Sequence, residues 1–192
     1  MTFRRSPLAL AILGLLENGP LHPYGIQRLL KQWGKDQVVN VGQRTSLYRM
    51  IGRLEEAGLI TVGATERDER YPERTVYHLT DAGRAICREW LAEILTTPRN
   101  EFPEFPAGLS FVMLLPPETA GELLAQRRER LTKRIADLQL ELGSEVDGHP
   151  VPRFALLETE YQVAVTAAEA EWIDGVLGDL RTGALTWTPG PV

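Results

Sequence analysis

Basic and small polar residues share one face of a helix predicted within residues 41–60. At about 100° per residue, Ser46, Arg49 and Arg53 fall on the same side. Arginine can bond guanine O6 and N7 together, and serine can bond phosphates or base edges. The opposite side is apolar and carries residues at helical spacing: Leu47, Met50, Ile51 and Leu54. The pattern indicates a helix for the DNA major groove, and a solvated amphipathic helix is the alternative.

Two runs of β-branched and aromatic residues follow this helix, after Gly58, which is typical of a helix end. Residues 59–62 and 75–79 predict two strands of a hairpin. The tip between them, 63–74, holds seven charged residues and Pro72. Its arginines could reach the DNA backbone or minor groove, or could pair with acidic neighbours in the loop. They are Arg67, Arg70 and Arg74.

The sequence offers no pattern for catalysis or metal binding. Its three histidines lack the spacing of metal ligands, and the single cysteine, Cys87, cannot build a zinc cluster. There is no Gly-rich phosphate loop, no G-x-S-x-G and no H-E-x-x-H. We therefore expect neither an enzyme nor a cofactor. Cys87 is interpreted as a core residue rather than a redox switch.

Three further helices are expected to position the helix at 41–60. Residues 7–17 are apolar nearly all round, so that helix should be buried on several sides. Residues 23–33 carry an apolar stripe that ends at Trp33, and Thr80 is placed to cap a helix over 81–95. Three helices followed by a charged hairpin predict a winged helix-turn-helix DNA-binding domain over 1–95, within a mainly α fold with a small β-hairpin wing.

The C-terminal half is predicted to be helical. The stretch 96–106 contains three prolines and is interpreted as a linker. Helical segments are expected at 107–115, 117–145 and 154–181, and residues 183–192 read as a loose, flexible tail. The two long segments carry apolar seams expected to form a helical hairpin. The seam residues are Leu124, Leu131, Ile135, Leu138 and Leu142, then Leu157, Tyr161, Ala164, Ala168 and Trp172.

A helical hairpin alone buries too little apolar surface, so residues 107–182 predict a dimerisation domain. A second copy of the chain would cover the remaining surface. A dimer would also pair two recognition helices with two half-sites about one DNA turn apart. The alternative is a monomer whose hairpin packs on its own winged domain.

Charge is divided unevenly along this chain of net charge −5. Residues 1–95 hold 13 Arg/Lys against 11 Asp/Glu, a net of +2, and residues 96–192 hold 8 against 15, a net of −7. The acidic total therefore does not exclude DNA. No apolar run reaches a membrane span. Residues 4–16 imitate a secretory signal without a cleavage site, so a cytoplasmic protein is preferred.

Three segments resemble the PadR family of bacterial transcriptional regulators: HPYGI (22–26), SLYRMIGRLEEAGLI (46–60) and RTVYHLTDAGR (74–84). The resemblance covers residues 6 to about 90. One departure is Arg44-Thr45, where many members have Gly or Pro-Gly. The resemblance implies that Tyr48 and the basic residues of its helix, Arg44 among them, contact the operator. It also implies dimerisation through the C-terminal helices, helped by the N-terminal helix.

Members of this family can bind flat hydrophobic compounds at the dimer interface. Trp90 and Trp172 are therefore candidates for binding a small aromatic effector, and core packing is the alternative for both. The whole pattern predicts a homodimeric repressor that binds an inverted repeat in double-stranded promoter DNA and has no membrane partner. An adaptor that docks a protein through the winged domain is the alternative from another functional class.

Overall fold

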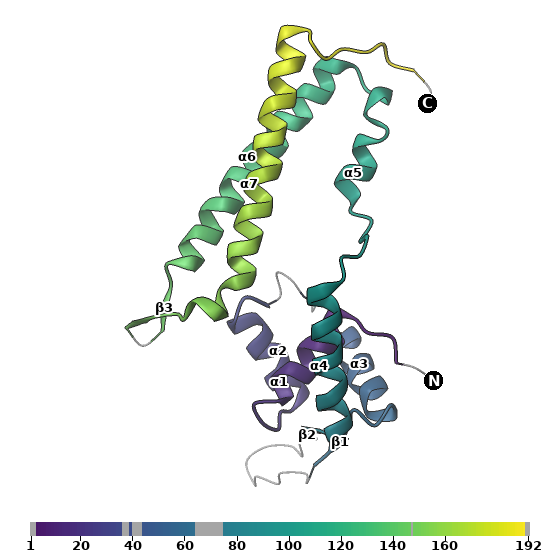
Figure 1. Ribbon diagram of the computed structural model, residues 1–192, viewed down its shortest axis with the longest axis vertical. Coiled ribbons are helices and arrows are strands. Elements are labelled where there is room, and N and C mark those ends of the chain that lie inside the picture. Colours follow the sequence, from purple (N-terminus) through teal and green to yellow (C-terminus); the bar gives the residue numbers. More distant parts are fainter. Residues whose placement is uncertain (1–2, 36–38, 40–43, 64–74, 147, 191–192) are drawn as a thin grey trace. The chain divides into compact units, whose positions relative to one another are not determined.

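The computed structural model describes residues 3–35, 39, 44–63, 75–146 and 148–190 of the 192-residue chain, and at Arg44 and Val146 the backbone alone (Figure 1). The chain divides into two compact units, Met1–Asn100 and Glu101–Val192. Helices dominate both units, and the first also holds a two-stranded antiparallel hairpin. The predicted fold class, mainly α with a small β-hairpin wing, is confirmed.

Side-chain caps fix where the helices of the first unit begin. The hydroxyl of Ser6 accepts a hydrogen bond from the Ala9 amide, and Pro7 occupies the first turn. His22 caps the second helix, because its Nδ1 accepts from the Gly25 amide at 2.6 Å. Thr80 caps the fourth helix as predicted. The helices are α1 (Pro7–Leu16), α2 (Pro23–Gln32), α3 (Arg44–Glu56) and α4 (Asp81–Thr96).

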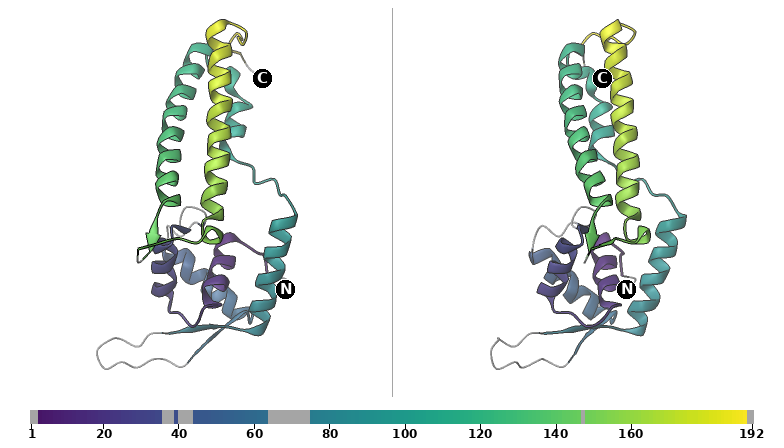
Figure 2. Two further views of the ribbon diagram at one scale, coloured as in Figure 1. Left: turned by 60° about the vertical axis from the view of Figure 1, so that its left-hand side comes forward. Right: turned by 90° about the vertical axis from the view of Figure 1, so that its left-hand side faces the viewer.

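The predicted hairpin is formed by β1 (Ile60–Val62) and β2 (Tyr77–Leu79), which lie side by side in both views of Figure 2. Ile60 stands opposite Leu79 in the antiparallel register. Leu21, just before α2, adds a one-residue bridge to Tyr77 with hydrogen bonds of 3.1 and 2.9 Å. The chain entering α2 is therefore anchored to the wing strand.

Helix α1 lies at the centre of the first unit and contacts α2, α3, α4 and β2. These contacts explain its apolar sequence, and the predicted burial on several sides is confirmed. Trp33, expected on the apolar stripe of α2, is instead 46% exposed because the helix ends before it. The innermost side chains come from α1, α2, α3 and β1: Ile12, Leu13, Ile26, Leu30, Leu47, Ile51, Leu54 and Ile60.

One junction joins the end of α3, the wing and the start of α4. The Thr80 hydroxyl is shared between the carbonyl oxygens of Gly58, at 2.8 Å, and Leu59, at 3.0 Å. The same oxygen accepts a hydrogen bond from the Gly83 amide at 3.0 Å. A Cβ on Gly83 would lie 2.0 Å from the Leu59 carbonyl oxygen, so only glycine fits there. Gly58 has φ +70°, the left-handed conformation predicted for it.

The second unit is built on two long antiparallel helices, which Figure 1 shows side by side. The predicted linker at 96–106 is too long, because Thr96 belongs to α4 and a short helix begins at Glu104. Pro106 is tolerated there since first-turn amides need no intrahelical partner. The unit contains α5 (Glu104–Leu109), a 3-10 turn (Val112–Leu114), α6 (Pro117–Leu142), β3 (Glu145–Val146), β4 (His149–Pro150), a 3-10 turn (Arg153–Ala155) and α7 (Leu157–Thr182).

The seam between α6 and α7 differs from the predicted one on the α7 side. Thr159, Ala170 and Ile173 are the buried residues of α7. Arg128, which interrupts the α6 seam, donates through Nε to both carboxylate oxygens of Asp174 at 2.9 Å. The stripe predicted for α7 is wrong as a hairpin seam, because its members are all exposed: Leu157, Tyr161, Ala164, Ala168 and Trp172.

Residues after α7 make more contacts than a loose tail requires. The indole of Trp187 donates to the Leu115 carbonyl at 2.8 Å, and the Gly190 amide donates to the Met113 carbonyl at 3.4 Å. This segment therefore returns to the 3-10 turn that precedes α6.

The junction yields a test of the first unit's stability. Gly83→Ala is expected to lower the free energy of unfolding by about 1–3 kcal/mol, because its Cβ would overlap a backbone carbonyl that cannot move aside. Gly14→Ala is the matched control, since that exposed helical glycine has nothing within 4 Å of the added Cβ. The control should gain about 0.5–1 kcal/mol. Urea unfolding followed by circular dichroism measures both, and equal stability of the two variants would contradict the packing described.

Candidate nucleic-acid interface

The exposed face of α3 carries the residues that the sequence predicted there. Arg49 and Arg53 are exposed, Tyr48 is 56% exposed and Ser46 is half-buried. The opposite face is held in the core by Leu47, Ile51 and Leu54. The helix therefore presents a cationic and aromatic surface. It cannot rotate about its axis without removing its apolar side chains from the core.

The two arginines of this face differ in their surroundings. The Arg53 guanidinium lies 5.1 Å from the centroid of the Phe3 ring. A guanidinium stacked on a ring keeps its N–H groups at its edge, where they can bind a base or a phosphate. For Arg49, no ion-pair partner is found within the part of the chain that the structure describes.

Tyr48 lies near the wing as well as on α3. The pKa of Tyr77 on β2 is raised, mainly by burial and to a smaller extent by the Glu55 carboxylate and by Tyr48. Tyr77 therefore stays a neutral phenol at physiological pH. Its strand also carries the backbone bridge to Leu21, so the wing and the start of α2 are joined at Tyr77.

Helix α2 adds exposed residues that the sequence interpretation missed. Tyr24 is 58% exposed, and its ring lies 6.1 Å from that of His22, the cap of the helix. Arg28 and Lys31 are also exposed. Their spacing from Tyr24, at i+4 and i+7, places all three on one side of the helix, and this spacing could have identified them. They form a second exposed surface, on a helix that packs against α3.

The other predicted DNA contacts cannot be placed. The side chain of Arg44 and the hairpin-tip residues Arg67, Arg70 and Arg74 lie outside the described residues.

Trp90 and Cys87 are core residues of the first unit. Trp90 is 5% exposed and stacks on Phe3, with ring centroids 5.8 Å apart and planes 27° apart. Cys87 is 8% exposed, and burial is the main reason why the pKa of its thiol is raised. A thiol of raised pKa is a poor nucleophile, which agrees with a packing role.

Trp172, unlike Trp90, lies in the second unit. It is 47% exposed, and its ring meets Phe105 of α5 edge-on at 6.1 Å. The Arg127 guanidinium lies 3.7 Å from the same Phe105 ring, and its Nε donates to Glu169 of α7. Phe105 is therefore the residue that connects Trp172 to the pocket described next.

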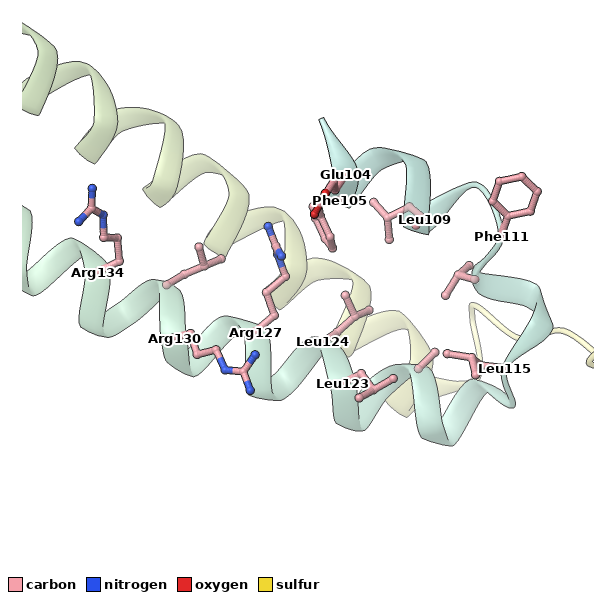
Figure 3. Close-up of a pocket in the computed structure, with 14 residues that line it drawn as sticks. Glu104, Phe105, Leu109, Phe111, Leu115, Leu123, Leu124, Arg127, Arg130 and Arg134 are labelled. Atoms are coloured by element: carbon pink, nitrogen blue, oxygen red, sulfur yellow. The ribbon is translucent and has the colours of Figure 1, made fainter. Parts of the chain in front are cut away.

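A pocket of about 630 Å³ lies between α5, the following 3-10 turn and α6 (Figure 3). Arg127, Arg130 and Arg134 line it from α6, and Glu104 lines it from α5. Arg127 pairs with Glu169, and Arg134 donates to Gln162 at 2.7 Å. Most of the remaining lining is apolar: Phe105, Leu109, Phe111, Leu115, Leu123 and Leu124. The second unit thus offers an apolar groove with a cationic wall.

The described residues hold neither a cluster of metal-binding side chains nor a helix suited to a membrane. No three His, Cys, Asp or Glu side chains gather there as they would to hold a metal ion. In the same residues, no helix has the length and apolar character needed to cross a membrane.

Residues 12–89 match the model of the transcriptional regulator PadR-like family. The negative transcriptional regulator PadR of Bacillus subtilis (strain 168) is 26% identical over 185 residues, covering 88% of this chain and 95% of the relative.

Solved structures share the fold along nearly the whole chain. Bacillus subtilis PadR in complex with operator DNA has a TM-score of 0.72 at 23% identity, covering 91% of this chain and 99% of that one. The same protein in complex with p-coumaric acid has a TM-score of 0.71 at 22% identity, with 92% and 99% covered. The Vibrio cholerae virulence activator AphA has a TM-score of 0.65 at 24% identity, with 92% and 99% covered. The match runs from within α1 to within α4 and takes in the wing, so this part of the chain is similar to the PadR-like family of transcriptional regulators.

Proposed function

We propose that this protein is a dimeric, ligand-responsive repressor that binds an inverted repeat in promoter DNA, with residues 1–95 as the DNA-binding domain. The observation that carries the proposal is the exposed face of α3, with Tyr48, Arg49 and Arg53 opposite a fully packed apolar face. The repressor assignment is supported by the Bacillus subtilis relative, a negative transcriptional regulator whose solved structure contains operator DNA.

In this proposal, α3 enters the major groove and the wing arginines contact the backbone or minor groove. Arg49 and Arg53 read bases or phosphates, and Ser46 and Tyr48 bind along the same face. Arg44, Arg67, Arg70 and Arg74 add cationic contacts at the start of α3 and in the wing. Such a regulator acts in the cytoplasm, needs no cofactor and catalyses no reaction.

Dimerisation is assigned to residues 107–182, and the exposed stripe of α7 supports it. Leu157 is 55%, Tyr161 70% and Trp172 47% exposed, so three large apolar side chains face solvent on one side of one helix. Ala164 and Ala168 lie between them and would let a second helix approach closely. A second copy of the chain would cover this stripe and place two recognition helices on two half-sites.

The pocket of the second unit supports a small aromatic effector. Its walls combine the Phe105 ring with three arginines, and Trp172 meets that ring edge-on. An aromatic acid would match both the apolar and the cationic walls. Bacillus subtilis PadR has been solved with p-coumaric acid, a compound of this kind. In this proposal Trp172 takes part through Phe105, and Trp90 takes part only through the packing of α4.

The first prediction concerns the face of α3. Arg49→Ala and Arg53→Ala are each expected to weaken binding by about 1–3 kcal/mol if the arginine reads a base. The target is a duplex recovered from random-sequence DNA with the unmodified protein, and fluorescence anisotropy measures the affinity. Lys133→Ala, an exposed cation on α6, is the control. Unchanged affinity in both arginine variants would refute the assignment of α3.

A second prediction concerns the α7 stripe. Ala168→Glu is expected to convert the dimer into a folded monomer at micromolar concentration, because it buries a carboxylate between two apolar helices. Ala167→Glu is the control, since that exposed alanine lies one residue outside the stripe. Sedimentation velocity measures both variants. A monomeric unmodified protein, or a dimer that persists in Ala168→Glu, would show that α7 does not form the interface.

A third prediction concerns the pocket. p-Coumaric acid is expected to quench tryptophan fluorescence and to lower DNA affinity about tenfold, which needs about 1.4 kcal/mol of coupling. Its uncharged methyl ester should bind more weakly, because only the acid can pair with arginine. Arg130→Gln should remove this difference, and Lys133→Gln should leave it. Equal binding of acid and ester to the unmodified protein would contradict the cationic wall as the site.

A further inference from the structure

The N-terminal segment before α1 lies between the recognition helix and α4. Its Phe3 side chain packs against the core of the first unit, with the ring stacked on Trp90 of α4 at 5.8 Å. The Arg53 guanidinium of α3 lies 5.1 Å from the centroid of the same ring. Phe3 thus has a core tryptophan and an exposed arginine of the proposed DNA-binding face as neighbours.

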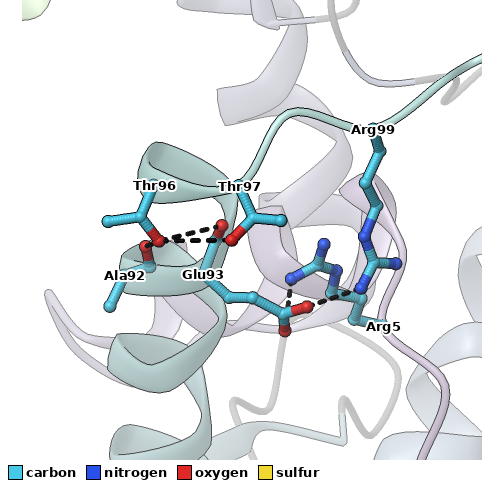
Figure 4. Close-up of polar contacts among 6 residues, drawn as sticks. All are labelled: Arg5, Ala92, Glu93, Thr96, Thr97 and Arg99. Atoms are coloured by element: carbon cyan, nitrogen blue, oxygen red, sulfur yellow. Dashed lines mark hydrogen bonds and ion pairs between the residues drawn. The ribbon is translucent and has the colours of Figure 1, made fainter.

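The same segment is also held by charge. Arg5, 14% exposed, places Nη1 2.6 Å from a carboxylate oxygen of Glu93, out of line for a hydrogen bond but close for an ion pair. The other oxygen of Glu93 accepts a hydrogen bond from Arg99 at 2.5 Å. Figure 4 shows the two guanidinium groups reaching the carboxylate together. Glu93 therefore fixes the N-terminal segment and the first residues after α4 at one point.

These contacts restrict a side chain that is otherwise flexible. An arginine side chain on a helix surface samples many rotamers. When it binds DNA it is confined to one of them, and this costs conformational entropy. A ring beneath the guanidinium selects a narrower set while leaving the edge N–H groups available for a base or a phosphate. Restriction before binding improves affinity by lowering that cost.

We propose that Phe3 is a positioning residue for Arg53: it orients the guanidinium for DNA, and the Glu93 ion pairs hold the segment that carries it. This inference rests on the proposed function, since it requires α3 to bind DNA. It adds a contribution from the segment before α1, and it links the exposed arginine to the point where the chain leaves α4.

The test compares Phe3→Leu with Arg53→Ala, singly and together, on the selected duplex. Phe3→Leu keeps an apolar side chain against Trp90 but removes the ring face. We expect it to weaken binding about tenfold, within the range for losing a well-placed charged contact, with thermal unfolding close to that of the unmodified protein. In the Arg53→Ala background, Phe3→Leu should have no further effect. In the Arg49→Ala background its effect should persist in full.

The base preference of the variants supplies a second measurement, because a change in stability alone would not alter which bases are preferred. Phe3→Leu and Arg53→Ala should relax discrimination at the same position, or should weaken all sequences alike if Arg53 binds phosphate. Glu93→Gln should weaken binding only while Arg53 is present, and Glu89→Gln, an exposed neighbour on α4, should not.

Three results would overturn the inference. The first is a Phe3→Leu variant that binds DNA as tightly as the unmodified protein. The second is a double variant whose loss of affinity is the product of the two single losses, and the third is a Glu93→Gln variant that binds DNA like Glu89→Gln. An unmodified protein that recovers no duplex from the selection overturns the proposed function and this inference together. One that binds DNA but ignores Phe3→Leu overturns the inference alone.

Discussion

The hydrogen bonds of one hydroxyl determine how the first unit is assembled. Thr80 ends the wing, begins α4 and bonds the two carbonyl groups that follow α3, so three elements meet at a single side chain. Gly83 lets α4 approach the Leu59 carbonyl more closely than any side chain would permit. The direction of α3 relative to the wing therefore depends on a contact outside the exposed face that is proposed to bind DNA.

This constraint is consistent with the proposed role of α3 in reading bases. Base recognition requires side chains held within a fraction of an ångström, and a helix on a soft support would lose that precision. The buried face of α3 packs on α1, which is itself enclosed by α2, α4 and β2. The ends of the Arg49 and Tyr48 side chains can thus move, whereas the backbone that carries them is held by the core.

The sequence was sufficient to predict the local structure wherever a residue pattern is compatible with only one backbone arrangement. The Thr80 cap and the left-handed Gly58 fixed the ends of helices because their chemistry acts locally. The exposed arginines of α3 followed from the same periodicity as its buried leucines.

Periodicity failed where a helix has two faces that could each be buried. The regular stripe of α7 was assigned to the hairpin, whereas the structure buries Thr159, Ala170 and Ile173 and leaves the stripe exposed. Spacing identifies an apolar face but not which neighbour covers it. Contacts between distant residues were also beyond prediction: Phe3 with Arg53, and Phe105 with Trp172, join segments that share no motif.

In the proposed function, the first unit binds DNA through the exposed face of α3 rather than docking a protein. The most direct measurement is the affinity of the full-length protein for a selected duplex across a range of salt concentrations. Each neutralised phosphate contributes about −0.9 to the slope of log K against log salt, so a dimer with several contacts predicts a slope of about −4 or steeper. A slope near zero, or no binding to duplex DNA at low salt, would contradict the account and favour the protein adaptor.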